Sequence, residues 1–435
     1  MKTIDKIPTG KLGRTGKMLQ TGLKVGGNYL KYYGKKAVNP EASLEELHQS
    51  NADDIYNGLK SLKGSALKVA QMLSMEKNLL PGAYVEKFSL AQFSVPPLSA
   101  PLVRKTLKKY HGLYPEDLFD SFSRESVNAA SIGQVHKATK DGKELAVKIQ
   151  YPGVAESISS DLAMVKPIAL KMFNLKAKDS EKFFREVEGK LLEETDYLLE
   201  VQQSKEISEA CEVMPNMRFP KYYEELSSEK IITMDWMHGR HLSDFAKTNK
   251  DKKAADKIGQ TLWDFYLFQI HGLKAVHADP HPGNFLVDEE NNLIAIDFGC
   301  IKRLPEEFYQ PYFELTRKEN FEDPELLKSR LHDLEILQSS DSEAEENYFT
   351  QLYYQMLSLF SRPLNTEKFD FSDPAFLAEI AALSERYGKD PGLRKMNTNR
   401  GSEHFIYISR TFMGLYMLLH ELGATIETGA FRKYL

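Results

Sequence analysis

The sequence has little cysteine and no long apolar run. Only two of its 435 residues are cysteines, Cys211 and Cys300, so neither a C-x-x-C zinc motif nor a disulfide framework can be built from them. A reducing, cytoplasmic setting is therefore expected. The stretch closest to a membrane span, residues 405–424, is interrupted by Arg410, His420 and Glu421, which favours a buried helix over a membrane span. No signal peptide is expected, because no apolar core follows the first lysines.

The chain also lacks an excess of charge and several common catalytic motifs. Its 57 Lys and Arg residues against 62 Asp and Glu residues give a net charge of −5, which argues against bulk binding of nucleic acid. It has no Walker A loop, no G-x-S-x-G and no His/Cys cluster suited to zinc. An apolar content of 42% is ordinary for a globular chain of two or three domains.

The most informative motif is H-A-D-P-H-P-G-N at residues 277–284, followed by a D-F-G that begins at Asp297. Asp279 and Asn284 stand five residues apart, and an apolar strand pattern leads to Asp297. Protein kinases place a catalytic Asp, an Asn five residues later and the D-F-G Asp in this order. Mg²⁺ prefers oxygen ligands and is usually held by one or two protein groups beside phosphates. Each fragment alone is common, but together they predict Asn284 and Asp297 as metal ligands and Asp279 as the group that orients or deprotonates an acceptor.

Candidates for nucleotide contact precede this motif. Lys148, in A-V-K, is placed like the strand lysine that holds the α- and β-phosphates of ATP in kinases. Glu200, on a helical pattern of residues 181–208, is its expected ion-pair partner. Residues 231–239 are predicted to form the next strand and the hinge between lobes, where backbone groups near Asp235 and Met237 are candidates for binding adenine.

The loop that a kinase fills with glycines has side chains here, and each Cβ limits φ and hinders close approach to phosphate. Nucleotide is therefore expected to bind in an altered pose. The candidate loop residues are Ala129, Ala130, Ser131 and Gly133.

Two further groups of polar residues lie on predicted helices. Lys68 and Gln71 fall three residues apart on the edge of a helical pattern within residues 44–110, and by themselves they are ordinary polar residues of a helix edge. Glu194 and Asp196 lie in the pattern of residues 181–208. Asp196 stands one turn from Glu200, so a continuous helix would place these acids at the border of one cleft.

The first 36 residues are strongly basic, with nine Lys and Arg residues against one acid, Asp5, and with leucines and tyrosines between them. Such a stretch can lie on an anionic membrane surface. A flexible, solvated tail is the alternative, because the many glycines weaken a helix.

In this order the motifs resemble the UbiB (AarF) group of atypical kinase-like proteins, whose members support biosynthesis of ubiquinone and related isoprenoid lipids. The resemblance covers about residues 10–430, with Ala70 in place of the glycine of the K-x-G-Q motif. The matched positions are Lys68 and Gln71 for K-x-G-Q, Ala129 and Ala130 for the alanine-rich loop, and Glu194 and Asp196 for E-x-D.

The resemblance implies an α+β, bilobal protein-kinase-like fold with ATP and Mg²⁺ as cofactors. It also implies that the K-x-G-Q helix lies over the nucleotide cleft and restricts protein phosphorylation. The expected parts are a basic segment (residues 1–36), a helical extension (37–110), a small β-rich N-lobe (111–238) and a helical C-lobe (239–435).

Three functions remain open from the sequence. The first is a Mg²⁺-dependent ATPase or kinase-like enzyme acting with isoprenoid quinone or precursor lipids, in the cytoplasm and with peripheral membrane contact through the basic segment. The second is a nucleotide-gated module that binds or presents lipid and hydrolyses little ATP. The third is a protein kinase, which is disfavoured by the alanine-rich loop and by the lack of an A-P-E segment after D-F-G.

Overall fold

The computed structural model describes residues 11–38, 43–62, 97–129, 132–172, 177–388, 390, 400–402 and 404–434. The chain divides into two compact units. The N-terminal unit comprises Met1–Gln202 and Lys221–Trp236, and the C-terminal unit comprises Gln203–Pro220 and Met237–Leu435. The chain crosses between the units three times, and the last crossing, after Trp236, falls in the segment predicted to be a hinge.

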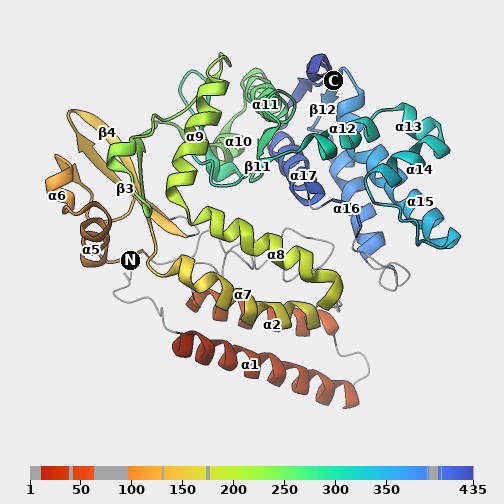
Figure 1. Cartoon of the computed structure of the whole chain (residues 1–435), viewed down its shortest axis with the longest axis horizontal. Coiled ribbons are helices and arrows are strands. Elements are labelled where there is room, and N and C mark those ends of the chain that lie inside the picture. Colours follow the sequence, from red (N-terminus) through yellow and green to blue (C-terminus); the bar gives the residue numbers. More distant parts are fainter. Residues whose placement is uncertain are drawn as a thin grey trace. The chain divides into compact units, whose positions relative to one another are not determined.

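A five-stranded antiparallel sheet forms the described β-structure of the N-terminal unit (Figure 1). Its order is β1-β3-β4-β6, with β2 also pairing with β3. Asp141 and Gly142 connect β3 to β4 with φ of 49° and 73°, the positive values that a two-residue type I′ hairpin requires. The strands are β1 (Ser121–Phe122), β2 (Asn128–Ala129), β3 (Gly133–Lys140), β4 (Lys143–Gln150) and β6 (Ile231–Asp235).

Helices pack together in the same unit, with α1 against α2 and α7, and α7 against α8 (Figure 1). The basic, glycine-rich segment is helical from Lys11 to Val38. At its contact with α2, a Cβ on Gly58 would collide with the side chain of Thr21, so this glycine permits close helix approach. The helices are α1 (Lys11–Val38), α2 (Leu44–Leu62), α5 (Ala100–His111), α6 (Pro115–Leu118), α7 (Val154–Met172), α8 (Ala177–Glu194) and α9 (Tyr197–Cys211), with the short η2 (Glu224–Leu226).

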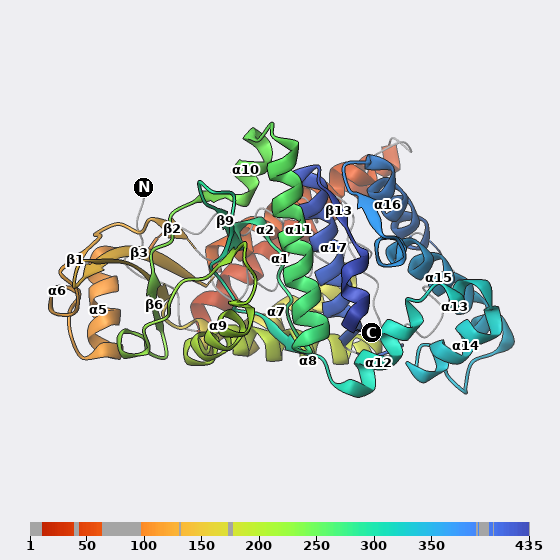
Figure 2. The same ribbon diagram turned by 90° about the horizontal axis from the view of Figure 1, so that it is seen from above.

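Short strands and many helices build the C-terminal unit (Figure 2). One sheet has the order β5-β10-β9-β7. Two further antiparallel pairs are β8 with β11 and β12 with β13. The strands are β5 (Met217–Arg218), β7 (Arg240–His241), β8 (Ala275–His277), β9 (Phe285–Val287), β10 (Leu293–Ala295), β11 (Ile301–Arg303), β12 (Lys368–Asp370) and β13 (Thr425–Glu427).

The helical core of this unit centres on α11, which packs against α17 (Figure 2). Trp263 and Tyr266 of α11 and Leu415 and Tyr416 of α17 are fully buried. The remaining elements are α10 (Leu242–Thr248), α11 (Lys252–Leu267), η3 (Phe268–Gly272), η4 (Pro282–Asn284), α12 (Glu306–Leu315), α13 (Glu319–Glu322), α14 (Pro324–Asp333), α15 (Glu343–Phe360), η5 (Arg362–Asn365), α16 (Pro374–Gly388), α17 (His404–Leu422) and η7 (Gly429–Tyr434).

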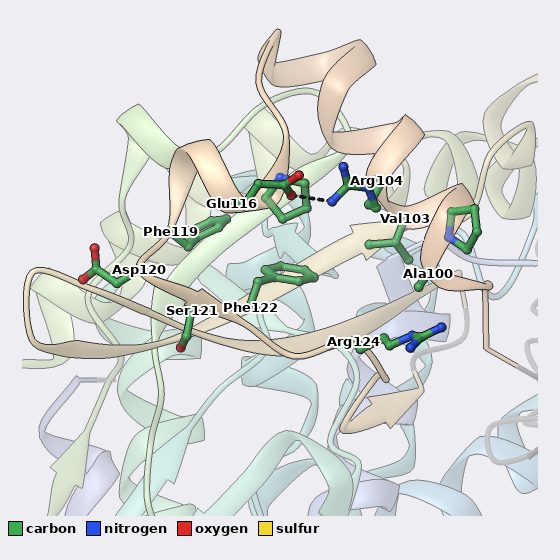
Figure 3. Close-up of a pocket in the computed structure, with 11 residues that line it drawn as sticks. Ala100, Val103, Arg104, Glu116, Phe119, Asp120, Ser121, Phe122 and Arg124 are labelled. Carbon is green, nitrogen blue, oxygen red and sulfur yellow. Dashed lines mark hydrogen bonds and ion pairs between the residues drawn. The ribbon is translucent and has the colours of Figure 1, made fainter.

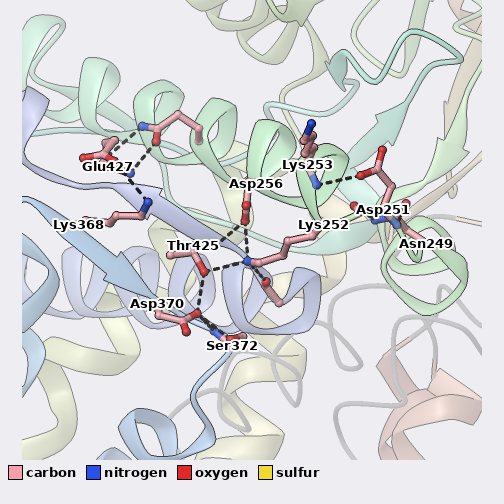
Figure 4. Close-up of polar contacts among 12 residues, drawn as sticks. Asn249, Asp251, Lys252, Lys253, Asp256, Lys368, Asp370, Ser372, Thr425 and Glu427 are labelled. Carbon is pink, nitrogen blue, oxygen red and sulfur yellow. Dashed lines mark hydrogen bonds and ion pairs between the residues drawn. The ribbon is translucent and has the colours of Figure 1, made fainter.

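Polar contacts fix the β12–β13 pair to the start of α11 (Figure 4). The Lys252 ammonium group donates to the Gly423 carbonyl oxygen at 2.7 Å and to Thr425 Oγ1 at 2.8 Å, and it pairs with Asp256 at 2.7 Å. The Thr425 backbone N–H donates to Asp256 Oδ1 at 2.7 Å. Since Gly423 directly follows α17, these contacts hold the carboxyl end of that helix against α11.

Two sequence interpretations about helices can be compared with the structure. The apolar stretch of residues 405–424 lies mostly in α17, and the buried side chains of this helix agree with the predicted core helix. Within the described ranges, none of the helices has the length and apolar character needed to cross a membrane. The continuous helix expected for residues 181–208 is wrong. The helix is interrupted at Thr195 and Asp196, between α8 and α9.

Candidate nucleotide and metal site

The N-terminal unit pairs Lys148 with Glu200. Lys148 lies in the middle of β4, opposite Val135 of β3 and Ile232 of β6, so strands flank it on both sides. Its Nζ is 2.6 Å from Glu200 Oε1 on α9, and the two side chains are 10% and 7% exposed. The ring of Tyr197 lies 5.3 Å from the same Nζ. A buried lysine held this firmly is a defined point charge, suited to contact with phosphate.

The break between α8 and α9 separates Glu194 from the other two acids that the sequence placed on one helix. Asp196 lies just before α9, and its Oδ1 accepts the backbone N–H of Leu199 at 3.1 Å, as an N-cap residue does. Its side chain is exposed, whereas Glu194 at the end of α8 and Glu200 in the first turn of α9 are buried. The expectation of one helix for these acids is therefore wrong for Glu194, whereas Asp196 still stands one turn before Glu200, whose backbone N–H donates to the Asp196 carbonyl oxygen at 3.0 Å.

The loop before β3 is described in part. Ala129 ends β2 opposite Gln134, and Gly133 begins β3 opposite Gln150. A Cβ on Gly133 would lie 2.7 Å from both the Ile149 carbonyl oxygen and the Tyr197 hydroxyl, so this position requires glycine. Ala130 and Ser131 lie outside the described residues. The same is true of Lys68 and Gln71, so the proposed roles of all four stay predictions.

At the expected adenine-binding hinge, contacts inside the N-terminal unit occupy Asp235. Its Oδ1 accepts from the Tyr223 hydroxyl at 2.8 Å and its Oδ2 from the Lys221 backbone N–H at 3.1 Å. The backbone N–H groups of Asp235 and Trp236 donate to other carbonyl oxygens of the unit. The structure thus uses Asp235 to hold the end of β6, and of the two predicted hinge residues Met237 is left as the better adenine candidate.

In the C-terminal unit, strand pairing brings the H-A-D-P-H-P-G-N loop and the D-F-G segment together. In the β9–β10 pair Phe285 lies opposite Ala295, which places Asn284 and Asp297 at the same end of this pair. The Ile296 backbone N–H donates to the Asn284 carbonyl oxygen at 3.0 Å. In the β8–β11 pair, the backbone N–H of residue 278 likewise donates to the carbonyl oxygen of residue 300 at 2.8 Å. The H-A-D-P-H-P-G-N loop and the D-F-G segment are therefore tied at both sides.

Backbone contacts also close the loop of residues 277–284 on itself. The Asp279 carbonyl oxygen accepts from the His281 N–H at 2.8 Å and from Asn284 Nδ2 at 2.9 Å. His281 Nδ1 accepts the Gly283 N–H at 3.0 Å. A buried glutamine in the π-helical turn η3, Gln269, accepts the His277 backbone N–H at 2.9 Å and anchors the start of the loop. The backbone of Asp279 is thus held independently of its side chain.

The donor chemistry of Asn284 and Asp297 fits Mg²⁺. Because Asn284 Nδ2 donates to the Asp279 carbonyl, its Oδ1 is turned away from that bond. Asp297 Oδ1 accepts the Gly299 N–H at 2.9 Å, which fixes the carboxylate at the D-F-G turn. Among the described residues no group of three His, Cys, Asp or Glu side chains is placed to hold a metal ion. Two oxygen donors beside phosphates are the pattern typical of Mg²⁺ rather than of zinc.

The structure adds a residue that the sequence analysis treated only as an interruption of an apolar stretch. Arg410 of α17 reaches Asp279, with Nη2 at 2.8 Å from Oδ1, and both side chains are 13% exposed. Tyr266 of α11 is fully buried, and burial and the charge of Asp279 raise its pKa well above the ordinary value. A charge inside an apolar helix pattern signals a buried partner, and this signal could have identified Arg410.

A separate hollow of about 470 Å³ lies in the N-terminal unit between α5, α6 and β1 (Figure 3). Val103, Phe119 and Phe122 supply apolar walls, and the Arg104–Glu116 ion pair lies along one side of it. None of the residues predicted to bind nucleotide or metal lines this hollow. It is therefore distinct from the candidate site.

Comparisons with known proteins show which family and which fold the chain resembles. The ABC1 atypical kinase-like domain matches residues 90–328. The probable serine/threonine-protein kinase abkA of Dictyostelium discoideum is 28% identical, over 97% of this chain and 78% of the relative. The mitochondrial atypical kinase COQ8B of Danio rerio is 28% identical (87% of this chain, 62% of the relative), and mitochondrial coq-8 of Caenorhabditis elegans is 24% identical (98% and 57%). The chain thus spans less than two thirds of the length of these last two proteins.

A solved structure shows the same fold. It is the complex of Rv3197 with erythromycin from Mycobacterium tuberculosis, which superposes with a TM-score of 0.61 at 25% identity and covers 89% of this chain and 96% of that one. The prediction of an α+β protein-kinase-like fold with N-terminal helices is confirmed. Because the matched domain covers more than half of the sequence, the chain belongs to the ABC1 (UbiB/AarF) family of atypical kinase-like proteins.

Proposed function

We propose that this chain is a Mg²⁺-dependent, kinase-like ATPase that supports the biosynthesis or homeostasis of isoprenoid quinones or related lipids. The observation that carries the proposal is the pairing of β9 with β10 and of β8 with β11, which gathers Asp279, Asn284 and Asp297 on tied loops. Lys148, held in its ion pair with Glu200, is the candidate for the lysine that contacts the phosphates of ATP in kinases. The lipid half of the proposal is supported by the kinship with COQ8-type proteins.

The residues divide the work as follows. Lys148, held by Glu200, contacts the phosphates of ATP. Asn284 Oδ1 and the Asp297 carboxylate would hold Mg²⁺, which neutralises phosphate charge when it is bound. Asp279 orients the attacking water or another acceptor and accepts its proton. Within its own unit, each of these five side chains stands on a strand, a helix or a hydrogen-bonded turn.

We also propose that Lys68 and Gln71 restrict access of protein substrates, as the family resemblance implies. This part rests on the sequence, because both residues lie outside the described ranges. Lys68→Ala should raise autophosphorylation in the presence of ATP and Mg²⁺. Unchanged autophosphorylation would leave Lys68 with a structural role.

The exposed side chains of helix α1 support the proposal that the chain makes peripheral contact with lipid. Leu23 and Leu30 lie seven residues apart on one helical face and are 78% and 77% exposed, and Tyr33, three residues further, is 61% exposed. Lysines accompany these apolar side chains along the helix. A basic helix with an exposed apolar stripe is suited to lie at an anionic membrane surface.

The second candidate function is a nucleotide-gated module that binds or presents lipid with little ATP turnover. The Rv3197 complex favours it, because a structural relative of this chain is described with erythromycin, a ligand that is neither a protein nor a nucleotide. A protein kinase is the third candidate, supported by the name of the abkA relative.

One assay separates the first two functions. Phosphate release from ATP is measured with Mg²⁺, with and without anionic liposomes that contain a quinone precursor, for the natural chain and for Asp297→Asn. Turnover that rises with liposomes and is lost in the variant supports the lipid-coupled ATPase. Nucleotide-dependent liposome binding without turnover supports the lipid-binding module instead.

A further inference from the structure

One face of α17 lies directly on the loop that carries Asp279. A Cβ on Gly414 would overlap the Pro280 ring and would come within 3.1 Å of the Pro280 carbonyl oxygen, so the backbone of α17 touches the loop at this glycine. Tyr407, two turns earlier, packs with Ala278 and Cys300. The helix therefore contacts residues on both sides of Asp279 and the residue that follows D-F-G.

Arg410 lies between these two contacts. Residues 407, 410 and 414 are spaced by three and four, so they share one face of the helix. From this face the guanidinium group donates to Asp279 Oδ1 at 2.8 Å. Both side chains are only 13% exposed, which means that the pair is formed away from bulk water. Two charges lose hydration when they are buried in this way, so the contact is unfavourable to build unless it is specific.

The loop does not need this ion pair to hold its backbone. The Asp279 carbonyl oxygen already accepts two hydrogen bonds, and the neighbouring residue 278 is bonded to residue 300 across the β8–β11 pair. What these bonds leave open is the direction of the Asp279 carboxylate. Replacement of both members of a buried ion pair by apolar residues is often neutral for stability, so the stability of the fold does not by itself explain why a charged pair is placed here. The pair thus adds orientation of the side chain and little else.

We propose that Arg410 is a positioning residue, which fixes the orientation of the Asp279 carboxylate through Oδ1. This inference rests on the proposed function of Asp279. The contacts of Gly414 and Tyr407 fix the distance between α17 and the loop. At this distance the hydrogen bond from Arg410 holds the Asp279 carboxylate in one orientation. The C-terminal helix is in this way part of the catalytic apparatus, although no motif of the sequence marks it.

The test is steady-state ATP turnover by the full chain with Mg²⁺, with kcat and the KM for ATP measured separately. Arg410→Gln should lower kcat by about tenfold to a hundredfold, the scale of a misplaced reacting group, while KM changes by less than about twofold. Arg410→Lys keeps the charge without the planar fork and should give an intermediate kcat. If Arg410→Gln does not fold, Arg410→Met keeps the apolar stem and removes the pair.

Arg400→Gln is the matched control. Arg400 forms another buried ion pair of the same unit, with Asp341 at 2.6 Å, and its side chain is 2% exposed. This variant should lower stability and leave kcat unchanged in the folded protein. Addition of guanidinium at millimolar concentration should restore part of the activity of Arg410→Ala and should not change the activity of the control.

The outcomes separate the two levels of the proposal. An unchanged or raised kcat in the Arg410 variants, with an active natural chain, overturns the positioning role and leaves the ATPase standing. A loss of kcat that is equal in the Arg400 control also overturns it, since the effect would then be structural. A natural chain without ATP turnover overturns the proposed function and the positioning role together.

Discussion

The Lys148–Glu200 ion pair is the contact whose removal has the clearest consequence in the N-terminal unit. Its atoms are 2.6 Å apart and its side chains are 10% and 7% exposed, so neither charge is compensated by water if the partner is lost. Breaking a buried pair from one side costs about 3 to 5 kcal/mol. We therefore expect Glu200→Ala to lower the free energy of unfolding of this unit by about that amount.

Glu200→Gln separates charge from shape. The amide keeps an oxygen that accepts from the Lys148 ammonium group, so one neutral hydrogen bond replaces a charged one. Charged hydrogen bonds contribute about 1.5 to 3 kcal/mol and neutral ones about 0.5 to 1.5 kcal/mol, which gives an expected loss of about 1 to 2 kcal/mol. The variant should also bind ATP more weakly, because the lysine loses the group that directs it.

Urea unfolding followed by tryptophan fluorescence and circular dichroism measures both losses. The double variant Lys148→Met, Glu200→Leu should lose much less than the sum of the single changes, because no unpaired charge is left buried. Additive losses would refute the reasoning, since they would mean that the two side chains do not interact in solution. An Asp196→Asn control keeps a residue that can cap α9 and should change little.

Three more predictions concern the C-terminal unit. Hydrogen bonding to Arg400 is the main cause that lowers the pKa of Asp341. The stabilisation from this contact is complete at neutral pH and is lost as the pH falls from the unfolded pKa of about 3.9 through the lower folded pKa. Arg400→Gln should therefore weaken the loss of stability at acid pH, measured by urea unfolding, and an unchanged pH dependence would contradict the assignment. Gly414→Ala should lower the free energy of unfolding by about 1 to 3 kcal/mol, because the added Cβ overlaps Pro280 in the loop of residues 277–284. Gly189→Ala in α8, where a Cβ meets nothing within 4 Å, should be neutral or stabilising in thermal unfolding, and equal effects of the two changes would exclude the overlap. Asp279→Asn should lower ATP turnover by about a hundredfold or more, the usual scale for loss of a general base, and normal turnover would remove its catalytic role.

The sequence predicted the parts of the site that depend on local spacing. Asp279, Asn284 and Asp297 are separated by short segments, and the strand between the two loops could be recognised from its apolar residues. The pairing of Lys148 with Glu200 follows from a strand lysine and a later helix acid that the kinase pattern connects. Their roles stay proposals, although the structure brings these side chains to the expected elements.

The remaining features depend on contacts between distant segments, which no periodicity records. Arg410 lies 131 residues after Asp279, and only the packing of α17 on the loop joins them. The break at Asp196 was missed because residues on both sides have helical periodicity, and a cap is visible only once the side chain is seen to accept the Leu199 N–H. The glycine-rich first segment is helical despite low propensity, because its close packing on α2 outweighs the cost of glycine.

The fate of the γ-phosphate tests the central claim most directly. The purified chain is incubated with γ-labelled ATP and Mg²⁺ in a single turnover, beside Asp297→Asn, and label is counted in inorganic phosphate, protein and lipid fractions. The account predicts release mainly as inorganic phosphate, with little label on protein, and loss of release in the variant, because Asp297 is proposed to be a metal ligand. Equal release by Asp297→Asn, or label found mainly on protein, would contradict it.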